Sequence, residues 1–182
     1  MNHIESLTNE LHCRLLGRPC KTLPTTIAAE AITDKTTLDT LFTFIYNGDD
    51  PLRWRAAWAL EKVSRQHPSL IVDERKHIKA LAMQSDTPNG LRRLLLNILI
   101  HLPDEIDLDV SFFNFLLDKM LDLRSSSGVQ ALAMKLAYRL SKVDYDLHEE
   151  FLCIIQNMEL DFYSAGIKAV ANNCLRNKKR DT

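Results

Sequence analysis

The sequence predicts an all-α protein, and three observations lead to that prediction. Glycine is scarce, with five in 182 residues, and apolar residues recur at helical spacing with no sustained alternation of period two. Short polar breaks such as GDDP (48–51) and SSSG (125–128) interrupt this pattern at short intervals. One apolar motif also recurs along the chain, which favours a solenoid of stacked helical hairpins over a single globular bundle.

The breaks divide the chain into ten predicted helices of about three to five turns each. These lie near residues 3–16, 24–33, 35–47, 50–66, 70–84, 88–102, 107–122, 125–142, 146–158 and 161–177. The first two, within residues 1–34, are expected to cap the N-terminal end of the stack. Residues 35–177 are expected to form about four hairpins, and residues 178–182 a basic flexible tail.

The repeated motif is clearest in DPLRWRAAWALEKV, residues 50–63. Its slots hold Leu52, Arg53, Ala56, Ala59, Leu60 and Val63, and the later copies hold Leu91, Arg92, Leu95, Ile98, Leu99 and Leu102, then Val129, Gln130, Ala133, Leu136, Ala137 and Leu140, then Ile167, Lys168, Ala171, Cys174 and Leu175. The first slots, at 52, 91, 129 and 167, are 39, 38 and 38 residues apart, close to the period of a two-helix solenoid repeat. An apolar helix precedes each copy, so the repeated unit is a hairpin.

These residues resemble the HEAT and HEAT-like (armadillo-type) repeat family. The second helix of that repeat typically carries an aliphatic residue followed by Arg, a small residue three positions later, and an Ala-Leu pair beyond it. Residues 52–60 match this pattern, whereas Leu95, Gln130 and Lys168 depart from it. The resemblance covers residues 35–177 and implies a right-handed α-α superhelix whose second helices line an extended concave surface. Family members are mostly protein-interaction scaffolds, and some bind nucleic acid.

The candidate binding residues lie opposite the apolar stripe of the repeated helices. On a helical wheel the apolar slots of residues 52–63 span about 100° of arc, and Trp54 and Trp58 fall on the far side together with Glu61. The resemblance implies one partner-binding groove lined by Trp54, Trp58, Lys62, Arg65, Arg93, Asn97, His101, Lys135, Tyr138, Arg139 and Arg176. Two interpretations of the indoles stay open. The N-terminal helices cover them as a cap, or the pair anchors a peptide or stacks on a base.

Charge is segregated between the repeated helices and the rest of the chain. Windows over residues 53–66, 90–102, 124–142 and 164–180 hold 15 basic residues and one acid, Glu61, while the remainder holds 8 basic and 23 acidic residues. Part of this pattern has a local cause, because acids favour helix starts and bases favour helix ends. The other interpretation is a basic groove that faces an acidic protein segment or a phosphate backbone.

Two classes of function follow, and the first is favoured. It is a non-enzymatic scaffold or adaptor that binds a protein or acidic peptide through the concave, basic and aromatic groove. The alternative is a nucleic-acid-binding HEAT-like protein similar to the alkylpurine DNA glycosylases, which are built from the same hairpins. Those enzymes place a carboxylate beside aromatics in the groove, and Glu61 is the only acid on this face. Base excision is therefore disfavoured.

Composition and motifs argue against several other classes of protein. The sequence contains no GxGxxG, GxxxxGK[ST], HExxH or GxSxG motif, and its six histidines lack metal-ligand spacing, so we expect no cofactor and no metal. The net charge of -1 gives no argument for nucleic acid or membrane. The N-terminus lacks signal-peptide features, and the four cysteines form no CxxC pair, which favours free thiols. We expect a cytoplasmic protein with Cys174 in its core, and the oligomeric state is left open.

Overall fold

The computed structural model describes residues 3–17, 22–105 and 107–181, with side chains described from residue 5 to residue 176 outside those gaps. Within these residues the chain forms ten α-helices and no strand, which confirms the all-α prediction. The chain divides into two compact units, Met1–Leu102 and Pro103–Thr182, and each is described by itself.

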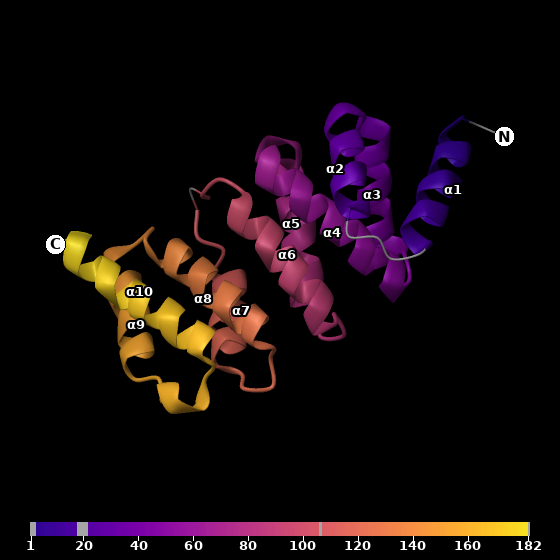
Figure 1. Ribbon diagram of the computed structural model, residues 1–182. Helices are drawn as coiled ribbons and strands as arrows, with labels where there is room; N and C mark the ends of the chain where they lie inside the picture. Colours follow the sequence, from indigo (N-terminus) through magenta and orange to yellow (C-terminus); the bar gives the residue numbers. More distant parts are fainter. Residues whose placement is uncertain (1–2, 18–21, 106, 182) are drawn as a thin grey trace. The chain divides into compact units, whose positions relative to one another are not determined.

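Unit 1 is built around its fourth helix. It comprises α1 (His3–Leu16), α2 (Leu23–Thr33), α3 (Lys35–Asn47), α4 (Asp50–Gln66), α5 (Arg75–Met83) and α6 (Asn89–His101). Helices α1, α2, α3 and α6 all pack against α4, and α5 pairs with α6 (Figure 1). Because neighbours surround α4, every side chain between residues 52 and 64 is buried or half-buried.

Side-chain interactions fasten α1 to its neighbours. The Arg14 guanidinium on α1 donates to both carboxylate oxygens of Glu30 on α2, at 2.8 and 2.7 Å. Arg55 on α4 donates to the backbone carbonyls of Leu15 and Gly17 at the C-terminal end of α1. The last carbonyls of a helix lack intrahelical partners, so a cationic donor placed there satisfies them and also favours the negative end of the helix dipole.

Unit 2 holds two further hairpins. Its helices are α7 (Val110–Leu121), α8 (Ser127–Ser141), α9 (Tyr145–Gln156) and α10 (Ala165–Asp181), with a 3-10 turn at Leu160–Phe162 before α10. Helix α8 packs against α7, α9 and α10, and α9 also packs against α10 (Figure 1). The pairs α7–α8 and α9–α10 are the third and fourth predicted hairpins.

The apolar slots of the repeat form the core, as predicted. In the first three copies all apolar slots are at most 5% exposed, including Leu60, Leu95 and Ala133 at 0%. In the fourth copy Ile167, Ala171 and Cys174 are buried and Leu175 is half-buried. Burial of these stripes is the main favourable free-energy term in folding, and it explains why the spacing of the sequence repeat matches the spacing of the hairpins.

The arginine in the second slot of the first two repeats has a structural role that the sequence pattern alone does not reveal. Arg53 donates to the carbonyl of Ile45 at 3.1 Å, and Arg92 donates to the carbonyls of Ala82 and Gln84 at 2.9 and 2.7 Å. Each of these acceptors lies at the C-terminal end of the preceding helix. The slot therefore ties the two helices of a hairpin together by capping the first with a side chain from the second.

The two departures from arginine in this slot have different consequences. Gln130 still caps its hairpin, because its amide Nε2 donates to the carbonyl of Asp122 just beyond α7, at 3.1 Å. Lys168 instead pairs with the exposed carboxylate of Asp161 at 3.2 Å. The capping contact thus persists through the third repeat, and the fourth replaces it with a surface ion pair.

Aspartates begin several helices and account for part of the charge segregation. The side chain of Asp34 accepts from the backbone N–H groups of Thr36 and Thr37, and Asp49, Asp109 and Asp144 cap α4, α7 and α9 in the same way. An N-cap carboxylate satisfies an otherwise unpartnered N–H group and complements the helix dipole. The local explanation for acids at these helix starts is therefore confirmed.

Three predicted helix boundaries differ from the structure by four or five residues, and several others by one to three. The helix expected from residue 161 begins at Ala165, after the 3-10 turn Leu160–Phe162. The helix expected from residue 70 begins at Arg75, because residues 68–74 form the 3-10 turns Pro68–Leu70 and Val72–Glu74 around Ile71, which is 0% exposed. Burying β-branched Ile71 between two short turns replaces a continuous helix in a stretch of low helix propensity. At the other end, α10 continues to Asp181, beyond the predicted limit at 177, and the flexibility of residues 178–182 stays a prediction.

Candidate partner-binding surface

The two tryptophans form a pair on α4 beside the start of α6. The ring centroids of Trp54 and Trp58 are 5.2 Å apart with the planes tilted by 51°, and both side chains are half-buried. A Cβ added to Gly90 would lie 3.6 Å from the Trp54 indole nitrogen, so the edge of that ring lies close to the start of α6. The pair is therefore partly covered and partly accessible, which leaves both interpretations of its role open.

Four predicted groove residues meet around the carboxylate of Glu61. Lys62 and Arg65 pair with it at 3.0 and 2.6 Å, and Asn97 on α6 donates to it at 2.9 Å. The fourth, His101, lies 3.8 Å from the same carboxylate. These contacts bring side chains of α4 and α6 together at Glu61, whose side chain is only 3% exposed.

The residues that contact Glu61 keep its carboxyl ionised. Burial opposes ionisation of this carboxyl, but the hydrogen bonds and positive charges of Lys62 and Arg65 outweigh it and lower the pKa of Glu61. The cluster is thus a network of ion pairs and hydrogen bonds that links α4 to α6 around a buried, ionised carboxylate.

Four further predicted groove residues belong to unit 2. Lys135 on α8 and Arg176 on α10 are exposed, whereas Arg139 pairs with Asp104 at 3.0 Å. Tyr138 packs against the rings of His148 and Phe151 at 5.2 and 6.1 Å. A single groove running through all the second helices stays a prediction, because these residues lie in a separate unit from those of α4 and α6.

Much of the basic character of the repeated helices is neutralised or has a structural role. Arginines 53, 55 and 92 satisfy backbone carbonyls at helix ends, while Lys62, Arg65 and Arg139 pair with carboxylates. Among the other predicted groove residues, exposed positive charge stands at Arg93, Lys135 and Arg176.

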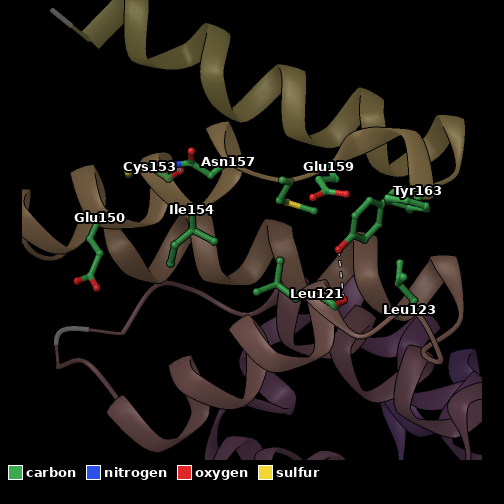
Figure 2. A pocket seen from close by; sticks show the side chains of 10 residues that line it. Leu121, Leu123, Glu150, Cys153, Ile154, Asn157, Glu159 and Tyr163 are labelled. Carbon is green, nitrogen blue, oxygen red and sulfur yellow. Dashed lines mark hydrogen bonds between the residues drawn. The ribbon is translucent and has the colours of Figure 1, made fainter.

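The sequence interpretation missed an apolar groove in unit 2. It has a volume of about 690 Å³ and is lined by Leu121, Leu123, Glu150, Cys153, Ile154, Asn157, Met158, Glu159, Phe162 and Tyr163. These residues come from the end of α7, from α9 and from the turn before α10, not from the predicted concave face (Figure 2). A sequence signal did exist, because aromatic Phe162 and Tyr163 stand in a connecting segment where polar residues are usual.

The described part of the chain contains neither a metal centre nor a membrane span. Among its residues, no set of three or more His, Cys, Asp or Glu side chains is arranged to hold a metal ion. Nor does any described helix combine the length and the hydropathy that crossing a bilayer requires.

Cys174 should resist alkylation in the folded protein. Its side chain is 5% exposed, and burial raises the pKa of the thiol to about 11, so little reactive thiolate exists at neutral pH. Cys13 and Cys153 are exposed. Timed iodoacetamide labelling followed by mass spectrometry should show both reacting at least about ten times faster than Cys174, with the difference removed by denaturant. Equal rates in the native protein would contradict a core role for Cys174.

The comparisons with known proteins bear on the fold. The family model described as HEAT repeat domain matches residues 7–178. No match was found among curated proteins or among solved structures.

Proposed function

The chain belongs to the HEAT repeat family, and from that premise we propose that it is a non-enzymatic scaffold that binds an acidic segment of a protein partner through the exposed faces of α4 and α6. Proteins built from HEAT repeats are typically non-enzymatic scaffolds, and the repeats commonly mediate protein interactions. The physical basis is that stacked hairpins offer an extended surface whose residues vary while the apolar slots stay constant.

The observation that carries this proposal is the half-buried Trp54–Trp58 pair beside an exposed arginine. Tryptophan and arginine dominate binding energy in protein interfaces, because a large ring or a planar cation can be desolvated at little entropic cost. Arg93 lies on α6 less than one turn after Gly90, and the Trp54 ring edge lies close to Gly90. An acidic segment could therefore place apolar atoms on the indoles and a carboxylate on Arg93.

The Glu61 network supports a binding role over a catalytic one. Its hydrogen bonds link α4 to α6 and fix their surfaces relative to each other, and such preorganisation reduces the entropic cost of binding. Glycosylase chemistry would need a carboxylate free to act on substrate, whereas Glu61 is buried and paired. We expect the protein to act in the cytoplasm, where free thiols persist.

The proposal predicts that partner capture depends on Trp58 and Arg93. Proteins retained from a cell extract by the immobilised wild-type chain should be lost with Trp58→Ala and reduced at least about tenfold with Arg93→Glu, as expected when an interface anchor is removed. Quantitative mass spectrometry of the retained proteins is the measurement. Because Arg93 is exposed, its reversal should leave the melting temperature nearly unchanged.

A matched control is available on the same unit. Lys76 is an exposed lysine on α5, outside the surface formed by α4 and α6, so Lys76→Glu makes the same charge change elsewhere. It should leave capture unchanged. Retention that is equal in wild type, Trp58→Ala and Arg93→Glu would refute the proposed surface, and Trp58→Ala is interpretable only if its melting curve shows a folded protein.

A further inference from the structure

We infer that the apolar groove of unit 2 is a second docking surface, and that its occupant is an amphipathic helix of a protein partner carrying Lys or Arg beside its apolar face. This goes beyond the proposed function, because the groove lies in the other unit and its charge is of opposite sign. A scaffold with both surfaces could bind two chemically different partners.

The walls of the groove are apolar and remain accessible. Leu121 is 40% exposed, Leu123 60% and Phe162 69%. Ile154 on α9 is half-buried, whereas Leu152, two positions earlier, lies in the core. Exposed apolar side chains that gather in one concavity mark interaction sites more reliably than the same residues scattered singly. A volume of about 690 Å³ accommodates several side chains.

The groove is held open by local structure. The Tyr163 hydroxyl donates to the carbonyl of Leu121 at 3.2 Å, which fastens the turn before α10 to the end of α7. Figure 2 shows this bond at one end of the groove, near Leu123, with Glu150 toward the other end and Ile154 between them. This bond ties two of the segments that line the groove to each other, which reduces the ordering that binding of a partner requires.

Charge complementarity identifies the occupant. The ten described lining residues include Glu150 and Glu159 and no Lys, Arg or His. The basic residues that follow α7 and begin α10 are already paired, Arg124 with Asp122 at 3.1 Å and Lys168 with Asp161 at 3.2 Å. An apolar segment flanked by Lys or Arg would bury its side chains against the leucines and place its cations on the two glutamates.

Selection from a displayed library of random peptides of about 15 residues, long enough for about four helical turns, tests this inference on the full chain. We expect enriched peptides that combine Lys or Arg with Leu-like residues at i, i+3, i+4 and i+7. Synthetic copies of the selected peptides should bind the Phe162→Ala variant of the chain about 30-fold more weakly than wild type. They should bind the double variant Glu150→Lys and Glu159→Lys at least about tenfold more weakly.

Two controls separate the groove from other surfaces. Tyr145 is 77% exposed in the same unit and does not line the groove, so Tyr145→Ala should leave affinity unchanged. Arg93→Glu on α6 should also leave it unchanged, which distinguishes failure of this inference from failure of the proposed function. Since Phe162 and both glutamates are exposed, their replacement should preserve the melting temperature.

Cysteine labelling gives a readout that needs no variant. Cys153 lines the groove and Cys13 lies on α1 in unit 1, and both are exposed. A bound peptide should slow alkylation of Cys153 and leave that of Cys13 unchanged.

Selection of no peptide, of acidic peptides, or of peptides insensitive to the groove variants would overturn the inference. So would a dimer of this chain that Phe162→Ala dissociates, because a second copy would then be the occupant.

Discussion

Replacing Arg92 with methionine is expected to lower the free energy of unfolding of unit 1 by about 2–4 kcal/mol. Arg92 is 5% exposed, and its guanidinium donates to the carbonyls of Ala82 and Gln84 at the C-terminal end of α5. Methionine is similarly long and unbranched but removes both donors, which leaves the carbonyl of buried Ala82 without this partner. Urea denaturation followed by circular dichroism measures the loss.

The same slot supplies its own graded controls. Gln130→Leu removes one neutral donor from the carbonyl of Asp122 and should cost about 1 kcal/mol. Lys168→Met breaks a surface ion pair with Asp161 and should change stability by less than about 0.5 kcal/mol. If Lys168→Met lowered the free energy of unfolding as much as Arg92→Met, capping of the preceding helix would not explain why arginine stands in the second slot.

Replacing Glu61 with glutamine is the second change expected to have a large effect. It removes the buried charge that Lys62, Arg65 and Asn97 contact, and should lower the free energy of unfolding by about 1–3 kcal/mol at neutral pH. The loss is smaller than for a fully buried pair, since Lys62 and Arg65 can turn toward water. The glutamine amide oxygen can still accept from Asn97, so the measured loss reports mainly the removed charge.

The effect of this change should depend on pH. The folded-state pKa of Glu61 is lowered, so its stabilisation is fully present above the ordinary glutamate value of 4.5 and is lost as pH falls through the folded-state pKa. The stability difference between wild type and Glu61→Gln should therefore be largest near neutral pH and should shrink in acid below 4.5. Parallel denaturation series at several pH values test this. A difference that grows on acidification would contradict the ionised network.

The hairpins are predictable from the sequence because the repeated apolar spacing marks the residues whose burial contributes most to folding. The first slots, Leu52, Leu91 and Val129, recur at spacings of 39 and 38 residues. All three are buried, and burial of such slots dominates stability. A helix boundary is less predictable where the burial of a single residue determines whether the helix continues. Ile71 is buried between two 3-10 turns, and a periodic pattern does not distinguish that arrangement from a continuous helix.

The candidate site is predictable only in part, because a helical wheel shows which side a residue faces and not what covers it. Lys62 and Asn97 do come together across α4 and α6, but the wheel does not show that Glu61 lies buried between them. Counting charges likewise does not separate Arg92, which caps α5, from exposed Arg93 one position later. The groove of unit 2 depends on contacts between residues 42 positions apart, such as Tyr163 with Leu121, and no local pattern encodes such contacts.

The most direct test of the central claim, that the surface of α4 and α6 binds protein rather than nucleic acid, is an anisotropy titration with labelled duplex and single-stranded DNA. It is run at low and at physiological salt with wild type and with Arg93→Glu, alone and combined with Lys135→Glu on α8 of unit 2. The account predicts no DNA binding at either salt concentration, because Lys62 and Arg65 on this surface are already paired with Glu61 and few cations are left for phosphates. DNA affinity that falls steeply with salt and is abolished by the charge reversals would contradict it, since such dependence shows release of counterions from phosphates.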